Sequence, residues 1–316
     1  MHYVIYGAGA IGGVVGGLLH RAGRDVSLIA RGDHLRALQE TGLVLDTPSG
    51  VETLRIPAVG SAAEVAWTDD TVVLLCVKGQ QTAAALDDLT AEAPPETVIV
   101  SAQNGVANES AILRRFKRTY STCVMLPATH LEPGVVVQRS VNAPGILDVG
   151  RVPSGADETA AAICADLRAA GFSSEPCEDI MAWKYRKLIR NLGNGVDAIA
   201  KPGPAADELE RRAVAEGEAA IAAAGIPMRS DAEDDARRGD LIRGRADRRG
   251  GSSTRQSVTR GSGVEIDYLA GEIVLLGRLH GVPTPVNELI QRTVHDVVRR
   301  GLPAGSLDAA DLLALL

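Results

Sequence analysis

Short apolar runs alternate with amphipathic stretches along the first half of the chain. The apolar pattern of buried strands covers residues 2–6, 25–29, 72–77, 98–101 and 122–126, and helical periodicity covers residues 11–22, 80–89 and 106–117. Because strands and helices alternate, we expect an α/β domain whose parallel sheet has helices on both faces. A hairpin or sheet edge is predicted for residues 135–138 and 146–149, and a further helix for residues 157–170.

Strand patterns disappear in the second half of the chain. Helices are predicted over residues 180–199, 207–224, 265–280 and 286–300, and Gly225-Ile-Pro227 and Gly281-Val-Pro283 are helix stops between them. A single core stops growing at about 250 residues, and this chain has 316. We therefore expect two domains, an α/β domain over residues 1–176 and a helical domain over residues 177–316.

Composition and charge exclude several classes of protein. The net charge of −7 gives no general attraction to nucleic acid or to an anionic membrane, and no apolar run approaches the ~20 residues that span a bilayer. An arginine-rich stretch over residues 237–255 is interpreted mainly as a solvated face. The four cysteines are scattered and no metal-ligand spacing is present, so we expect neither disulfides nor a metal site. Without a signal peptide, a cytoplasmic protein is expected.

The first predicted strand leads directly into a glycine motif, Gly7-Ala8-Gly9-Ala10-Ile11-Gly12. This spacing alone is weak in a chain with 34 glycines, but here it lies between a strand and a helix, inside a βαβ unit of about 30 residues. In that context Gly7 permits a tight turn, Gly9 lets the backbone approach a pyrophosphate, and Gly12 lets the helix lie close to the strand. A glycine-rich turn without a ligand is the alternative.

The end of the second strand indicates which dinucleotide binds. An acidic residue there binds the ribose of NAD, whereas this chain has Arg31. A guanidinium forms charge-assisted hydrogen bonds with a 2′-phosphate, so Arg31 favours NADPH/NADP⁺. Asp33 is close enough to keep NAD open, and an exposed arginine that begins a helix is the alternative interpretation of Arg31.

A polar stripe marks the segment from Trp183 to Asn194. At 3.6 residues per turn, one narrow face of the predicted helix holds Lys184, Lys187, Asn191 and Asn194. A solvated amphipathic helix would give the same pattern, but the helix also contains Gly193, and glycine in a helix costs about 1 kcal/mol relative to alanine. A partly desolvated lysine can protonate the alkoxide formed when a carbonyl accepts a hydride. Glu265, at the start of a predicted helix, is a candidate to assist the lysine, or simply an acid that complements the helix dipole.

Taken together, the motifs of this chain resemble those of the ketopantoate reductase (2-dehydropantoate 2-reductase) family over nearly its whole length. The matching motifs are Gly7-Ala-Gly-Ala-Ile-Gly12, Ala30-Arg31-Gly with His34-Leu and Gly42-Leu, Val77-Lys78, Gln103-Asn104-Gly105, Lys187-Leu-Ile-Arg-Asn191, Ser252-Ser253-Thr-Arg-Gln256, and Glu265-Ile-Asp-Tyr-Leu-Ala-Gly271. The ending Gly281-Val-Pro-Thr-Pro-Val-Asn287 is similar to the family's entry to its final helix.

The resemblance implies a Rossmann-type dinucleotide-binding domain followed by an all-α domain, with NADPH and a small 2-oxo acid in the cleft between them. It implies NADPH-dependent reduction of 2-dehydropantoate to (R)-pantoate on the route to coenzyme A. By the same likeness, Lys187 is the proton donor and Glu265 supports it at the reacting hydroxyl. The implied substrate-binding residues are Asn104, Asn191, Asn194 and Ser253, and Lys78 and Asn104 lie near the nicotinamide.

Some residues depart from the family pattern. The family's second asparagine usually stands one position after Asn194, where this chain has Gly195, and an aspartate usually stands at Ser257. The tryptophan lies four residues before Lys187 rather than two, which leaves Lys184 as a rival proton donor. These departures keep two alternatives open: a reductase of another small 2-oxo acid, and a non-catalytic NADP(H)-binding regulator. Alanines in the helical domain also permit the close helix contacts of a homodimer.

Overall fold

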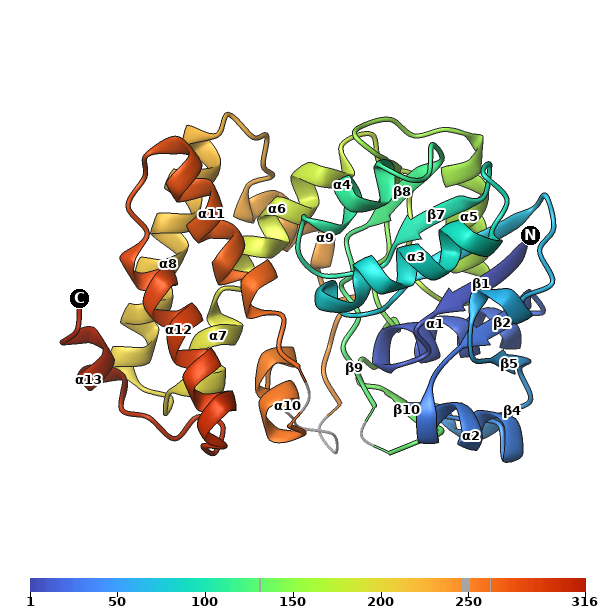
Figure 1. Cartoon of the computed structure of the whole chain (residues 1–316), viewed down its shortest axis with the longest axis horizontal. Coiled ribbons are helices and arrows are strands. Elements are labelled where there is room, and N and C mark those ends of the chain that lie inside the picture. The colour runs from blue at the N-terminus through green and yellow to red at the C-terminus, as the bar shows by residue number, and fades with distance from the viewer. Residues whose placement is uncertain (131, 246–250, 262) are drawn as a thin grey trace. The chain divides into compact units, whose positions relative to one another are not determined.

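The computed structural model describes residues 1–130, 132–245, 251–261 and 263–316, and its contacts divide the chain into two compact units. The first unit contains the described residues of Met1–Asn104, Asn108–Met181 and Ala232–Arg249. The second contains those of Gly105–Ala107, Ala182–Asp231 and Gly250–Leu316. The first unit is α/β and the second is helical, which confirms the expected fold class (Figure 1). The domain boundary expected after residue 176 stays a prediction. By its contacts, the first unit continues to Met181 and also includes the described residues of Ala232–Arg249.

A seven-stranded sheet forms the centre of the first unit. Its strands are β1 (His2–Tyr6), β2 (Asp25–Ile29), β5 (Ala58–Val59), β6 (Thr71–Leu75), β7 (Val98–Ser101), β8 (Thr119–Thr122) and β11 (Val149–Arg151). The order across the sheet is β11-β8-β7-β6-β1-β2-β5, and every pair is parallel except β11 with β8. Counted from β5, the parallel strands follow the order 3-2-1-4-5-6 of dinucleotide-binding folds. In such a sheet a ligand binds at the carboxyl ends of the strands, where the order reverses between β1 and β6.

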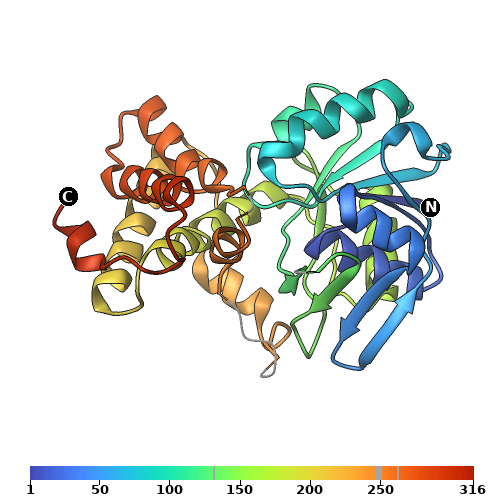
Figure 2. The ribbon, with the colours of Figure 1, turned by 60° about the horizontal axis from the view of Figure 1, so that its bottom comes forward.

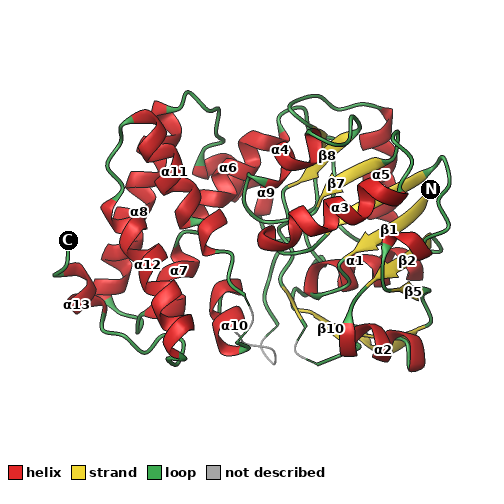
Figure 3. Ribbon diagram, viewed as in Figure 1, coloured by secondary structure: helices red, strands yellow, loops and turns green. Residues whose placement is uncertain are grey.

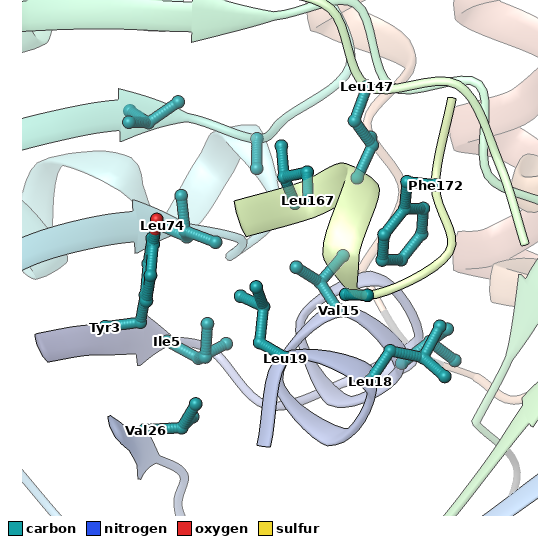
Figure 4. Packing of buried hydrophobic residues seen from close by; sticks show 14 of the residues in the cluster. Tyr3, Ile5, Val15, Leu18, Leu19, Val26, Leu74, Leu147, Leu167 and Phe172 are labelled. Carbon is teal, nitrogen blue, oxygen red and sulfur yellow. The ribbon is translucent and has the colours of Figure 1, made fainter. Parts of the chain in front are cut away.

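Helices cover both faces of this sheet, because the apolar side chains of its strands, β1 among them, must be buried on both faces. All five of its residues are buried, with Tyr3 and Ile5 in one apolar cluster and Val4 and Tyr6 in another, because successive side chains of a strand point to opposite faces. Figure 4 shows the first cluster, which contains Tyr3 and Ile5 together with leucines of α1 and α5. The helices of the first unit are α1 (Ala10–Arg21), α2 (Gly32–Glu40), α3 (Thr82–Glu92), α4 (Asn108–Leu113), α5 (Glu158–Ala169) and, almost entirely, α9 (Asp231–Arg238).

A second, four-stranded sheet was not anticipated from the sequence. It consists of β4 (Gly50–Leu54), β3 (Leu43–Thr47), β10 (Val135–Gln138) and β9 (Ala128–Thr129), in that order. In Figure 2 the blue hairpin of β3 and β4 lies beside the green strand β10. Of the two alternatives predicted for residues 135–138 and 146–149, the hairpin is wrong, because β10 pairs with β3 and β9. The sheet edge is found at the end of the second segment, where Val149 begins β11 at the edge of the large sheet.

The arginine-rich stretch is also not the solvated face that we expected, as far as it is described. Arg237 pairs with Asp148 at 2.6 Å, and Arg245 pairs with Asp46 at 2.8 Å; the four side chains are only 7–17% exposed. Backbone hydrogen bonds also join residues 241–245 to residues 139–143. These contacts attach the segment to the first unit. Arg248 and Arg249 lie outside the described residues.

Helices and loops make up the described part of the second unit (Figure 3). The helices are α6 (Ile180–Arg190, with its first two residues in the first unit), α7 (Gly193–Ile199), α8 (Pro204–Ala223), α10 (Ser253–Thr259), α11 (Ala270–His280), α12 (Pro285–Arg300) and α13 (Ala309–Leu313). The single helix expected over residues 180–199 is broken between α6 and α7, at Asn191 and Leu192. The helix expected from residue 265 begins instead as a short 3₁₀ turn, Ile266–Tyr268, before α11.

Candidate active site

The glycine loop has the geometry that a strand-to-helix turn in a dinucleotide fold requires. Gly7 has φ +101°, which side chains rarely allow, and a Cβ there would lie 2.8 Å from Val77 Cγ1. A Cβ on Gly12 would lie 2.2 Å from the carbonyl oxygen of Gly7, so this residue lets α1 approach β1 closely. Around Gly9, by contrast, no described atom lies within 4 Å of an added Cβ. Its open side is where a phosphate could approach the backbone.

The amino end of α1 is suited to an anion. Gly9 is the N-cap, no side chain caps the helix, and its first turn has no acidic residue. The N–H groups of Ala10, Ile11 and Gly12 point out of the first turn, where an α-helix has no backbone acceptors of its own. The partial positive charge of the helix end adds to their attraction for phosphate.

Arg31 follows the neighbouring strand β2 and forms the N-cap of α2. The loop after β1 is joined to β2 because the N–H groups of Gly7 and Ala8 both donate to the carbonyl oxygen of Ile29, at 3.0 and 3.1 Å. Arg31 is exposed, and its Nη2 donates to the hydroxyl of Tyr6 at 3.3 Å. Asp33 is engaged elsewhere, in an exposed ion pair with Arg36.

Buried polar side chains connect the loops that carry Lys78 and Asn104. The Gln103 amide donates to the Val77 carbonyl and to the Thr82 hydroxyl, both at 2.8 Å. Thr82 in turn donates to Asn108, whose amide donates to the carbonyl oxygen of Asn104 at 3.1 Å. This network fixes the loop after β6 relative to the loop after β7, at the carboxyl ends of adjacent strands. Lys78 and Asn104 themselves are partly exposed beside it.

In the second unit, the predicted polar stripe spans the break between two helices. Lys184 and Lys187 lie one turn apart on α6, where residues at i and i+3 share a face. Lys184 is only 3% exposed, whereas Lys187 is half-buried. The chain turns at Asn191, whose N–H donates to the Lys187 carbonyl at 3.0 Å and whose carbonyl accepts from Asn194 N–H at 3.1 Å. Asn191 and Asn194 are both partly exposed.

Ser253 is the first residue of the short helix α10, which is attached to α7. The Ser252 N–H donates to Asp197 at 2.9 Å, and the Ser252 hydroxyl donates to the Asn194 carbonyl at 3.3 Å. Arg255 donates to the carbonyl and carboxylate of Asp197, at 2.9 and 3.2 Å. These bonds bring the exposed Ser253 near the backbone of Asn194.

Glu265 lies at the N-cap of the 3₁₀ turn that precedes α11 and is half-buried. It does not begin a regular α-helix, so the interpretation of this carboxylate as a first-turn acid of a long helix is wrong. The nearby Asp267 accepts hydrogen bonds from Gln291 and His295, both at 2.7 Å. Although burial raises the pKa of Asp267, these two bonds lower it overall.

The described residues contain no group of three or more histidine, cysteine or acidic side chains placed to hold a metal ion. Within the same residues, none of the helices has the length and apolar character needed to cross a membrane.

Comparison with protein-family models covers most of the chain. Residues 3–154 match the model described as ketopantoate reductase PanE/ApbA, and residues 179–298 match the model of its C-terminal part. The chain belongs to the ketopantoate reductase family. The first match includes the glycine loop, Arg31, Lys78 and Asn104, and the second includes Lys187 and Glu265.

Individual relatives of this family member support the same family assignment. It is 30% identical to the 2-dehydropantoate 2-reductase of Pyrococcus horikoshii, over 92% of this chain and 95% of the relative. The crystal structure of a PanE/ApbA family ketopantoate reductase from Ralstonia eutropha JMP134 has 29% identity and a TM-score of 0.82, covering 95% and 99% of the two chains. D-mandelate dehydrogenase in complex with NADH and anilino(oxo)acetate also has a TM-score of 0.82, covering 96% and 100%, but its 23% identity shows a shared fold alone.

The sequence did not indicate the structural role of His34 in this ketopantoate reductase family member. His34 Nδ1 accepts from the Gly134 N–H at 2.9 Å, so Nε2 carries the proton and donates to the carbonyl oxygen of Ala8 at 2.7 Å. The imidazole thereby connects the glycine loop to the segment before β10. Burial lowers the pKa of His34, and contact with His130, whose ring centroid is 4.3 Å away, lowers it further. Only the spacing of His34 from Arg31 could have indicated this role.

Proposed function

We propose that this protein reduces 2-dehydropantoate to (R)-pantoate with NADPH. The proposal is carried by one observation: both family models match, and the chain keeps Lys187, Asn191 and Glu265 at the positions where the resemblance places the reacting groups. A non-catalytic regulator would have no need to keep this set. Most relatives that match the chain are named 2-dehydropantoate 2-reductases, including that of P. horikoshii.

The residues of the first unit fit a dinucleotide. The open side of Gly9 and the uncapped amino end of α1 would hold the pyrophosphate. Arg31 is the basis for choosing NADPH: among the described residues its guanidinium forms no ion pair with a carboxylate, and a 2′-phosphate would provide one. Lys78 and Asn104, held by the network around Gln103, would contact the nicotinamide half. A neighbour of the same fold binds NADH, so the NADPH assignment rests on Arg31.

NADPH, when bound, supplies the hydride that is added to C2 of the 2-oxo acid. Lys187, as an ammonium, would donate a proton to the oxygen that had been the C2 carbonyl and is left as an alkoxide. Glu265 would accept a hydrogen bond from the reacting hydroxyl and stabilise the charged lysine. Asn104, Asn191, Asn194 and Ser253 would orient the carboxylate and hydroxyl groups of the substrate. We assign the proton transfer to Lys187 rather than Lys184 because a substrate cannot easily reach a side chain that is only 3% exposed.

The test is to incubate the protein with NADPH and 2-dehydropantoate, follow the absorbance of the reduced cofactor, and identify the product by mass spectrometry and chiral chromatography. We expect stoichiometric formation of (R)-pantoate. Binding of NADPH without its oxidation would instead support a regulator.

A second candidate is the reduction of another small 2-oxo acid, and Gly195 favours it. An added Cβ at this position would lie 2.6 Å from Ile290 Cγ2, so the protein as packed has no room for the asparagine that the family usually has there. Asn194, at the preceding position, is the asparagine that this chain has instead. This departure from the family pattern favours a substrate of different shape.

We also propose that the protein is a cytoplasmic homodimer. None of its four cysteines forms a disulfide in the structure, as is usual in a reducing compartment. On α11, Leu275 and Leu279 lie one turn apart and are 49% and 67% exposed, which a second copy of the chain could cover. Light scattering during size-exclusion chromatography tests the dimer, and a monomer mass at micromolar concentration would contradict it.

A further inference from the structure

Strand β1 carries two tyrosines that each donate a hydrogen bond to an aspartate. Tyr3 donates to Asp166 at 2.7 Å on one face of the sheet, where Figure 4 shows its ring. Tyr6 donates to Asp88 of α3 at 2.6 Å on the other face. Both tyrosines are almost completely buried, with 0% and 2% of their surface exposed. The two pairs are nearly identical in chemistry and belong to the same strand.

The two pairs differ in how an arginine meets them. Arg24 contacts the carboxylate of Asp166 directly, at 2.9 Å, so its charge is matched by an adjacent negative charge. Arg31 instead donates to the hydroxyl of Tyr6, which separates the guanidinium from Asp88. Within the described residues, Arg31 forms no ion pair. The charge of Arg31 is therefore available to an anion, while one of its N–H groups is held by the hydrogen bond to Tyr6.

The Tyr6 hydroxyl is fixed in direction by its other partners. Asp88 accepts from Tyr6 and from the backbone N–H of Ala62, at 2.6 and 3.0 Å, so its carboxylate cannot easily turn away. Because the Tyr6 hydroxyl directs its proton toward the Asp88 carboxylate, its oxygen presents a lone pair to Arg31. Burial and the neighbouring Asp88 raise the pKa of Tyr6 far above physiological pH, so the hydroxyl stays neutral and does not cancel the arginine's charge.

The contacts among Asp88, Tyr6 and Arg31 lie at the end of the sheet where a dinucleotide fold binds its cofactor. Tyr6 is the last residue of β1 and directly precedes Gly7, and it lies opposite Ile29 of β2, two residues before Arg31. In a dinucleotide fold the adenosine ribose lies at this end of β2. We propose that Tyr6 and Asp88 are positioning residues that hold the Arg31 guanidinium for the 2′-phosphate of NADPH and so determine the preference for NADPH over NADH. This inference rests on the proposed function.

The physical advantage is preorganisation. An exposed arginine loses side-chain freedom when it binds a phosphate, and an arginine already held by one N–H loses less. A ligand that lacks the 2′-phosphate does not contact the guanidinium and gains nothing. The alternative is that the Tyr6–Asp88 bond merely attaches α3 to the sheet, in which case its loss would affect all ligands alike.

Calorimetric titration of the full-length protein with adenosine 2′,5′-bisphosphate and adenosine 5′-monophosphate separates these cases. We expect Tyr6→Phe to raise the Kd of the bisphosphate about threefold to tenfold, the effect of one hydrogen bond, and to leave the Kd of the monophosphate unchanged. Tyr3→Phe is the matched control and should leave both values unchanged. In an Arg31→Gln background, Tyr6→Phe should have no further effect on the bisphosphate.

Asp88→Ala provides a second test, because simple electrostatics and the positioning role predict opposite changes in the Kd of the bisphosphate. Removing a negative charge would by simple electrostatics tighten binding of the bisphosphate, whereas loss of positioning predicts weaker binding. Equal weakening of both ligands by Tyr6→Phe, an unchanged bisphosphate Kd, or tighter binding by Asp88→Ala would each overturn the inference. If Arg31→Gln leaves the ratio of the two Kd values unchanged, the NADPH assignment itself fails, which distinguishes that failure from failure of the positioning role alone.

Discussion

Two alanine substitutions in the glycine loop should affect different properties. Gly12→Ala should lower stability, whereas Gly9→Ala should weaken NADPH binding without lowering stability. At Gly12, the new Cβ would lie 2.2 Å from the Gly7 carbonyl oxygen and 2.8 Å from Ile5 Cγ2. Because the first contact is with backbone that is itself hydrogen-bonded to β2, the neighbour cannot simply move aside. Overpacking costs about 1–3 kcal/mol, and a contact as short as 2.2 Å with backbone belongs at the upper end of that range, so the cost exceeds the ~1 kcal/mol that alanine gains over glycine in a helix.

At Gly9 the added methyl meets nothing within 4 Å, and φ is −72°, which alanine readily adopts. Restricting the unfolded chain should leave stability unchanged or raise it by up to about 1 kcal/mol. If a pyrophosphate approaches this residue, however, the methyl occupies its place. We expect the Kd for NADPH to rise at least about tenfold, which corresponds to about 1.4 kcal/mol of binding free energy.

Both quantities can be measured on the same preparations. Differential scanning fluorimetry without ligand should show a melting temperature several degrees lower for Gly12→Ala and no lower for Gly9→Ala. Titration with NADPH, followed by fluorescence, gives Kd. Gly17→Ala is the control within α1, because its Cβ would meet only leucine methyl groups at 3.2–3.4 Å, and it should bind NADPH normally. Normal NADPH binding by a folded Gly9→Ala variant would refute the placement of the pyrophosphate.

Three further predictions concern other parts of the molecule. Lys187→Ala should lower kcat about 10²–10⁴-fold, as expected for loss of a general acid, with little change in NADPH affinity, and an equal loss in Lys184→Ala alone would move the role. Because burial lowers the pKa of His34 below the 6.5 of an unperturbed imidazole, the stability that it contributes is complete above that pH and is lost as pH falls through the lowered value. Urea denaturation between pH 7 and pH 5 should therefore show a smaller pH dependence in His34→Gln than in the wild type, and parallel profiles would exclude the imidazole as the cause. Arg237→Ala leaves the carboxylate of Asp148 buried without its guanidinium partner and should lower the free energy of unfolding by about 3 kcal/mol, whereas a change below 1 kcal/mol would mean that water replaces the pair.

The sequence predicted elements whose patterns are local. Strands β1, β2, β7 and β10 begin and end where the predicted strands do, because each pattern is short and local. The β3–β4 hairpin was missed although Leu43-Val44-Leu45 is a short apolar run that precedes a Pro-Ser-Gly turn. Its partner β10 lies about 90 residues further along the chain, and no local pattern indicates such a pairing.

The same limit applies to the candidate site. Gly7, Gly12 and Arg31 could be proposed as cofactor-binding residues from the sequence because each belongs to a short motif, and these assignments stay predictions. The roles of Tyr6 and His34 depend on Asp88 and Gly134, which are 82 and 100 residues away in the sequence. The arginine-rich stretch was misread for this reason, since charge composition shows that arginines are present but not that Asp148 and Asp46 lie against them.

The central claim is that this chain is an NADPH-dependent reductase of 2-dehydropantoate, and a matrix of kcat/KM values tests it most directly. The substrates are 2-dehydropantoate, its unbranched analogues and phenylglyoxylate, the 2-oxo acid that corresponds to mandelate, each with NADPH and with NADH. We predict the highest kcat/KM for 2-dehydropantoate with NADPH. A higher value for another 2-oxo acid or for NADH, or no oxidation of either cofactor by any of these acids, would contradict the claim.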